Sequence, residues 1–222
     1  MEDLVRKHEA IMDKYDPDRK VALVVDEWGS WLAPTPGTNP GFLMQQNSQR
    51  DAIVAALNLN IFARHAARVR MANIAQMVNV LQAMILTDQE KMVLTPTYHV
   101  FKMYVPFQDA TFVPVSYNAG DYSNGQVTMP RADVIAARDR NGKLWLALTN
   151  IDPNRPLNVE LALAGSSATR VIGQTLAAPR IDSVNTFNAP DTVAPKAVSG
   201  KVANGKVALS LAPESVTVVS IE

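Results

Sequence analysis

The sequence contains no cysteine among its 222 residues, which excludes a disulfide framework, a thiolate metal site and a cysteine nucleophile. It has no excess charge of either sign, because 21 basic side chains balance 21 acidic ones. This balance argues against a nucleic-acid binder, which would show a basic excess or stripe. No apolar run approaches the ~20 residues that span a bilayer, and the first 17 residues lack the apolar core of a signal peptide. We therefore expect a soluble, unexported protein that binds neither nucleic acid nor membrane.

Helical periodicity and short apolar runs alternate in residues 1–106. An apolar face recurring every three or four residues predicts a first helix, and its members are Leu4, His8, Ile11 and Tyr15. That helix should end at Asp16-Pro17, because a residue before proline is pushed out of the helical region. Residues 21–25 then form an apolar run without alternation, which is typical of a strand buried on both faces.

The same alternation continues further along the chain. Residues 50–67 have helical periodicity, and residues 69–75 indicate a second buried strand. Another helix is expected over residues 95–104, capped by Thr95 and with Pro96 at its first position. Strand, helix, strand, helix indicates a parallel sheet. Because a (β/α)₈ barrel needs ~250 residues and eight such units, we expect residues 1–106 to be the end of a barrel whose earlier strands lie outside this chain.

From residue 107 onward the hydrophobic period falls to two, as residues 144–149, 207–211 and 216–221 show. Asn-Gly pairs at 124–125, 141–142 and 204–205 predict type I′ hairpin turns. We therefore expect an antiparallel β-sandwich over residues 107–222, with residues 178–195 as a long surface connection. The fold class is α/β followed by all-β.

Carboxylates and aromatic side chains follow the first predicted strand directly. Asp26 and Glu27 come at its end, with Trp28 and Trp31 close behind. In parallel α/β folds catalytic groups come from the carboxyl ends of strands, and a glycosidase needs carboxylates as nucleophile and acid. The alternative is that these carboxylates cap a loop or pair with an arginine, while the tryptophans only pack.

Amide side chains follow the second predicted strand, namely Asn73, Gln76 and Asn79. Amides both donate and accept hydrogen bonds, which suits sugar hydroxyls. The alternative, which position alone favours, is that they satisfy backbone groups of the loop.

The three histidines, His8, His65 and His99, lack the spacing of a metal site. His65 lies near a helix end, where a positive side chain meets the negative end of the helix dipole. We expect structural roles for all three, and no metal or organic cofactor.

Five motifs, in this order and spacing, resemble the α-L-arabinofuranosidases of glycoside hydrolase family fifty-one. They are DEWGSW (26–31), GTNPGF (37–42), ALNLNIF with Arg64-His65 (56–65), NIAQMVN (73–79) and TPTYHVF (95–101). The resemblance implies that residues 1–106 hold strands seven and eight of a (β/α)₈ barrel and that residues 107–222 form the following sandwich. It also implies a retaining exo-enzyme that releases terminal α-L-arabinofuranosyl groups from arabinoxylan, arabinan or oligosaccharides.

Carried over residue by residue, the resemblance implies that Glu27 is the nucleophile, that Trp31 lines the sugar site and that Gln76 hydrogen-bonds the arabinose. The family's acid/base glutamate follows an asparagine at the end of strand four, and this chain has no Asn-Glu pair. We therefore expect the chain to need the missing N-terminal barrel part as a partner and to be inactive alone. The resemblance also implies a homo-oligomer when the protein is complete.

Two other interpretations stay open. The chain is alternatively a non-catalytic carbohydrate-binding or structural β module with residual barrel sequence, which would not need the carboxylate of Glu27. A retaining glycosidase of the same barrel superfamily with a different glycone is the third.

Overall fold

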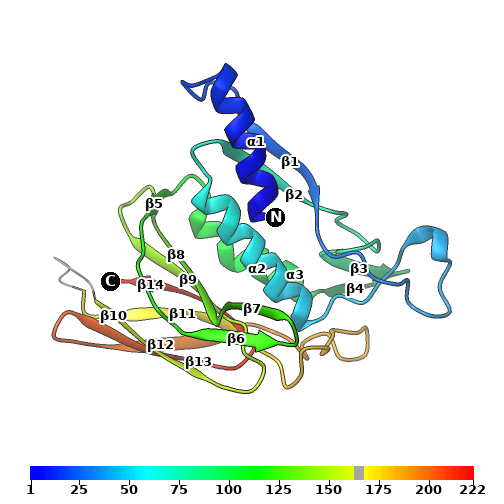
Figure 1. Cartoon of the computed structure of the whole chain (residues 1–222). Coiled ribbons are helices and arrows are strands. Elements are labelled where there is room, and N and C mark those ends of the chain that lie inside the picture. The colour runs from blue at the N-terminus through cyan, green and yellow to red at the C-terminus, as the bar shows by residue number, and fades with distance from the viewer. Residues whose placement is uncertain (163–167) are drawn as a thin grey trace.

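The computed structural model describes residues 1–162 and 168–222 (Figure 1). The elements before residue 108 are α1 (Glu2–Tyr15), β1 (Leu23–Trp28), η1 (Pro40–Phe42), α2 (Gln49–Arg64), β2 (Val69–Ile74), β3 (Ile85–Asp88), β4 (Lys91–Leu94), α3 (Pro96–Tyr104) and η2 (Val105–Phe107). The later elements are β5 (Thr111–Val113), β6 (Asp121–Asn124), β7 (Val127–Pro130), β8 (Ala132–Arg138), β9 (Leu144–Asn150), β10 (Leu157–Ala162), β11 (Val171–Leu176), β12 (Lys196–Ala203), β13 (Lys206–Leu211) and β14 (Ser215–Ile221). No helix of these described ranges is both long and apolar enough to cross a membrane.

Strands β1 and β2 pair in parallel, and α2 connects them, which confirms the predicted strand, helix, strand order. The last helix, α3, follows with Thr95 as its N-cap, whose hydroxyl accepts from the Tyr98 amide, and with Pro96 in its first turn. Burial of the first strand on both faces was the wrong expectation, because Val24 is 41% exposed. Val24 is exposed because β1 has a single hydrogen-bonded neighbour among the described residues.

Helix α1 ends before Pro17 as expected, but its apolar face does not pack on the described part of the chain. Ile11 and Tyr15 are exposed, the latter at 86%, and Val5 is the buried residue. The contact of α1 with the end of α2 is polar instead: His65 binds Glu9 through Nδ1 at 2.7 Å and Glu2 through Nε2 at 2.8 Å. The face of α1 that packs is therefore mixed: Val5 belongs to the hydrophobic core, and two glutamates bind His65.

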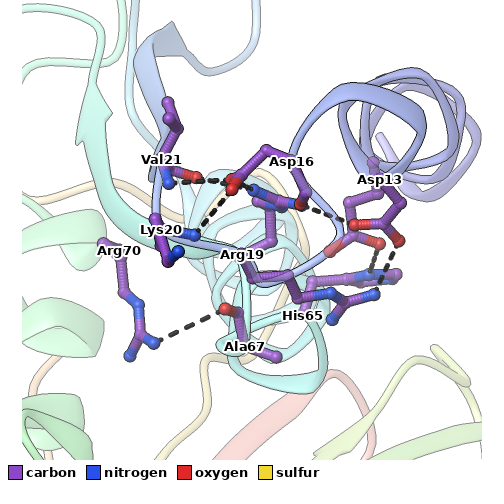
Figure 2. Close-up of polar contacts among 10 residues, drawn as sticks. Asp13, Asp16, Arg19, Lys20, Val21, His65, Ala67 and Arg70 are labelled. Atoms are coloured by element: carbon purple, nitrogen blue, oxygen red, sulfur yellow. Dashed lines mark hydrogen bonds and ion pairs between the residues drawn. The ribbon is translucent and has the colours of Figure 1, made fainter.

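Figure 2 shows the polar cluster at the amino ends of the two parallel strands. Asp16 accepts hydrogen bonds from the backbone amides of Lys20 and Val21, at 3.0 and 2.8 Å. The buried guanidinium of Arg68 donates to Asp16 and to Asp13, each at 2.5 Å, and to the Val21 carbonyl at 2.8 Å. Since Val21 precedes β1 and Arg68 precedes β2, the cluster fixes the two strands at the end opposite to where parallel α/β folds carry out chemistry.

The His65 contacts predict a pH dependence of stability. Burial by itself would lower the pKa of His65, but the carboxylates of Glu2 and Glu9 outweigh it and raise the pKa above 6.5. A raised folded-state pKa stabilises the fold fully below the unfolded-state pKa, and this contribution is lost as pH rises through the folded-state pKa. The stability lost in His65→Gln should therefore be largest below about pH 6.5 and should shrink above it. Urea unfolding of both proteins across this range measures it, and a loss that grows with pH would contradict it.

The region after residue 107 is sheet-rich, as expected, and forms a sandwich. Eight of the ten strands described there form one sheet in the order β10-β13-β12-β11-β14-β9-β8-β5, in which every pair is antiparallel. Strands β6 and β7 form a separate antiparallel hairpin. The buried side chains that fill the space between the two halves of the large sheet are Val134, Ala136, Leu146, Leu148, Val171, Val207, Leu209, Leu211, Val219 and Ile221. Strand β11 approaches β14 closely, because a Cβ at Gly173 would lie 2.0 Å from the carbonyl oxygen of Val218.

The predicted type I′ turn forms at one of the three Asn-Gly pairs. Asn204 and Gly205 both have positive φ, at 51° and 71°, as this turn requires. At the first pair Asn124 belongs to the ladder and pairs with Val127, so Gly125 occupies the first turn position and alone has positive φ. That arrangement is typical of type II′. The remaining pair, Asn141-Gly142, lies in the longer loop 139–143, where only the glycine has positive φ.

Helices α2 and α3 lie over one face of the large sheet (Figure 1), and a single hydrophobic cluster joins them to it. At the start of α2, the buried Gln49 amide donates to the Glu214 carbonyl at 2.6 Å. The connection 178–195 also takes part in this core, so the expectation that it lies at the surface is wrong in part. Val193 is fully buried, and Asn185 binds the carbonyl oxygens of Leu94 and Val193, each at 2.9 Å.

Candidate active site

Glu27 lies at the carboxyl end of β1, where the ladder to β2 is irregular. Val25 pairs with Ala72 and Trp28 with Ile74, so two residues of β1 face the single residue Asn73. Such a bulge changes the direction of side chains and is frequent beside active sites. The Glu27 side chain is exposed, and it forms no salt bridge with any described residue. Pairing with an arginine therefore does not explain its presence.

The two tryptophans near Glu27 differ in environment. Trp28 is buried, stacked on Phe101 at 5.9 Å between ring centroids and edge-on to Phe62 at 5.4 Å. It therefore packs against α3 and α2 and fixes the end of β1 on the helices. Trp31 is 68% exposed, so packing does not account for it.

Two buried glutamines hold the loop that carries Trp31. The side-chain oxygen of Gln82 accepts from the Ser30 amide at 2.8 Å, and that of Gln45 accepts from the Leu32 amide at 2.7 Å. The amide nitrogen of Gln45 donates back to the Ser30 carbonyl at 2.9 Å. The backbone on both sides of Trp31 is therefore fixed, and these hydrogen bonds rather than packing set its exposed position.

Close contact at Gly29 completes this arrangement. Its φ is 150°, and a Cβ on it would lie 3.0 Å from the Cβ of Gln82. The Gln82 amide nitrogen also donates to the side-chain oxygen of Asn47 at 3.0 Å. Sequence reasoning missed Gln45, Gln82 and Asn47, and the available signal was a polar residue inside an apolar stretch, as at Gln82 in residues 80–86.

The loop after β2 lies next to the end of β1, because the Ala75 amide donates to the Trp28 carbonyl at 2.7 Å. Gln76 follows directly, exposed and with φ of 65°, a conformation that a non-glycine residue rarely adopts outside functional or tight turns. Asn79 behaves as the alternative interpretation expected. Its amide binds the Thr87 hydroxyl at 3.0 Å and its oxygen accepts from the Thr87 backbone at 2.7 Å.

Comparison with known proteins then decides the family. The protein-family model for the alpha-L-arabinofuranosidase C-terminal domain matches residues 26–215. The chain belongs to this family.

Relatives of this arabinofuranosidase family agree. An intracellular exo-alpha-L-arabinofuranosidase of Bacteroides ovatus is 44% identical over 196 residues, which are 88% of this chain and 38% of the relative. The crystal structure of the GH51 arabinofuranosidase from Xanthomonas axonopodis pv. citri has 52% sequence identity and a TM-score of 0.97, covering 100% of this chain and 45% of that one. A thermostable GH51 enzyme from Thermotoga petrophila RKU-1, 23% identical with a TM-score of 0.85 over 99% of this chain and 47% of its own, shares the fold.

The chain thus spans less than half the length of these relatives. The resemblance to glycoside hydrolase family fifty-one, inferred from the five motifs, is confirmed.

The three histidines of this arabinofuranosidase family member lie within or at the end of helices. His8 binds the Leu4 carbonyl of its own helix at 2.9 Å, and His65 is the C-cap of α2. His99 is buried in α3, and that burial lowers its pKa. Within residues 1–162 and 168–222, no group of three ionisable side chains has the arrangement of a metal site.

Proposed function

We propose that this chain carries the nucleophile of a retaining exo-hydrolase that releases terminal α-L-arabinofuranosyl groups from arabinoxylan, arabinan or oligosaccharides. The observation that carries the proposal is the position of Glu27, exposed at the bulged carboxyl end of a parallel strand. Membership of the arabinofuranosidase family supports it. A binding or structural module would have no use for that carboxylate.

The proposal includes the architecture around the site. We assign β1 and β2 to strands seven and eight of a (β/α)₈ barrel, with residues 1–106 as its last part and residues 107–222 as the C-terminal sandwich domain. The parallel pairing of β1 and β2 and the helix between them support this assignment. The earlier strands would come from the missing N-terminal barrel part.

The first chemical step forms a covalent glycosyl-enzyme. A carboxylate oxygen of Glu27 attacks the anomeric carbon, the bond from that carbon to the leaving oxygen breaks, and a carboxylic acid protonates the leaving oxygen. In the second step a water oxygen attacks the same carbon and the ester bond to Glu27 breaks, while the second carboxylate takes the proton of the water. Retention requires the two carboxyl groups to lie ~5–5.5 Å apart. No metal or organic cofactor enters these steps.

The second carboxyl group is proposed to come from outside this chain. The family resemblance places it on a glutamate after an asparagine, and the sequence holds no such pair. We therefore expect little or no activity on natural substrates from this polypeptide alone. Trp31 would line the sugar site and Gln76 would hydrogen-bond the arabinose, and the exposure of both side chains beside Glu27 supports these roles.

Location is proposed from the names of the relatives, and assembly from the family resemblance. Proteins of Bacteroides ovatus and Streptomyces lividans that match this chain are named intracellular arabinofuranosidases. We propose that this chain is cytoplasmic as well, and that the complete enzyme is a homo-oligomer.

The nucleophile assignment is tested by trapping the intermediate. The chain is combined with the missing barrel part and given a 2-fluoro-arabinofuranoside with an activated phenol leaving group, which needs little acid assistance. Trypsin should release residues 21–50 as one peptide, because no lysine or arginine lies between Lys20 and Arg50. Mass spectrometry should find the sugar on this peptide, and fragmentation should place it on Glu27 rather than Asp26. A label elsewhere, or none, would reject the assignment and favour a non-catalytic module.

A further inference from the structure

A pocket of about 460 Å³ lies between loops from three parts of the chain. The segment after β1 contributes Phe42 and Met44, and the segment from β2 through β3 contributes Val80 and Leu86. The connection 178–195 contributes Phe187. The pocket volume is within the range of pockets that bind small ligands, about 300–1,000 Å³. The loop after β1 and the β3–β4 hairpin lie at the same end of the molecule (Figure 1).

The pocket is built on the two loops that carry the proposed sugar-binding residues. Its first wall belongs to the loop of Trp31 and its second wall begins three residues after Gln76. The two loops are joined by a hydrogen bond from the Leu81 amide to the Leu43 carbonyl at 3.1 Å. The first loop is also closed on itself, because the Thr35 amide donates to the Met44 carbonyl at 2.6 Å.

The backbone of these loops is strained where they meet. Leu43, Gln76 and Leu81 have φ of 52°, 65° and 49°, in the left-handed region that favours glycine. Such strain persists only where surrounding structure holds it, and it gathers at ligand-binding sites. The pocket is therefore fixed relative to the end of β1 rather than formed by a loosely attached loop.

The lining has the chemistry of an uncharged sugar site. Phe42 is 68% exposed and presents an aromatic face to solvent, and Phe187 adds a second ring. The polar groups around them are hydroxyls and amides, such as Thr38 and Asn39, with Asp88 as the single carboxylate of the lining. An apolar platform with a few neutral donors and acceptors suits a sugar ring, which has an apolar C–H face and hydroxyl edges.

We propose that this pocket binds the sugar unit on the leaving-group side of the bond that is cut, with Phe42 and Phe187 as its walls. The inference rests on the proposed function. An exo-enzyme holds the terminal arabinose at the strand ends, so the remainder of the substrate must extend outward along the same loops. Because Phe187 belongs to the connection 178–195, this connection as well as the barrel would determine which oligosaccharide is bound.

The test compares two substrates in the protein that contains this chain and the missing barrel part. An α-linked arabinotriose has sugar on the leaving-group side, whereas α-L-arabinofuranosyl fluoride leaves a single atom. The ratio of kcat/KM for arabinotriose to kcat/KM for the fluoride should fall about tenfold in Phe42→Ala and in Phe187→Ala. Tyr15 is an exposed aromatic residue at the end of α1, before the amino end of β1. Tyr15→Ala should keep the wild-type ratio.

The outcomes separate the two proposals. A wild-type ratio in Phe42→Ala, or an equal fall in Tyr15→Ala, would overturn the leaving-group site. Because Phe42 is largely exposed, this variant keeps the test valid even where Phe187→Ala does not fold. A wild-type protein that acts on neither substrate would instead reject the proposed function.

Discussion

Replacing Glu27 by alanine should reduce arabinose release by at least about 10⁴-fold in the protein that contains this chain and the missing barrel part. The reason is that the anomeric carbon then has no nucleophile within reach, while the sugar site itself remains. Glu27 is exposed and forms no salt bridge with any described residue, so its truncation leaves no buried charge unpaired and should not unfold the protein. Release of a phenol from an aryl arabinofuranoside measures the rate, and circular dichroism checks the fold.

Azide provides the matched test of position. In Glu27→Ala a small anion can enter the vacated space, bond to the anomeric carbon through nitrogen and displace an activated phenol. The product should be the β-configured azide, because attack comes from the side on which Glu27 stood. Asp26→Ala removes the neighbouring carboxylate and should yield none of this product. The β-azide from Asp26→Ala instead would make Asp26 the nucleophile.

Replacing Gly173 by alanine should cost about 3 kcal/mol of unfolding free energy or more, the upper end for overpacked sites. A Cβ there meets the Val218 carbonyl at 2.0 Å and the Val219 Cα at 2.6 Å. Both atoms belong to the backbone of β14, so the clash cannot be relieved by a side-chain rotation. The strands would have to separate in the middle of the sheet. Urea unfolding measures the change.

Ile172→Ala is the control for this substitution. Ile172 precedes Gly173 in β11, is 37% exposed and pairs with Ser199 and Ser220 in the same ladders. Its truncation changes a side chain at the surface and leaves the strand spacing intact. An equal loss of stability in the two variants would show that the close approach at Gly173 is not the cause.

The elements that depend on local pattern could be predicted from the sequence. Strand β2, helix α3 with its Thr95 cap, and the hairpin at Asn204-Gly205 all follow from residues within a few positions of each other. Glu27, near the carboxyl end of β1, and Gln76, shortly after β2, became candidates in the same way, because the ends of parallel strands meet. Their roles come from the family resemblance and stay predictions.

What escaped prediction depends on contacts between distant segments. Gln82 reaches Ser30 across 52 positions, and Gln49 reaches Glu214 across 165. The residues around one partner do not indicate the position of the other partner in the sequence. The packing face of α1 was misjudged for the same reason, because an apolar stripe such as that of Ile11 and Tyr15 does not show which neighbour will cover it. Phe187 lies in a connection without periodicity, so no pattern assigned it to a pocket.

The hydrogen bond from Gln49 to the Glu214 carbonyl bears on how such enzymes can recombine. A crossover at residue 106, in η2 between α3 and β5, would join these two parts of the chain from different relatives. In such a chimera α2 would pack against the sheet of another relative. The Gln49 amide would then face a backbone carbonyl other than that of its own Glu214. Because α2 directly precedes β2, which leads to Gln76, a misfit of α2 would also displace this proposed sugar-binding residue. The unit that can be exchanged between relatives is therefore the sandwich together with β1, α2 and β2.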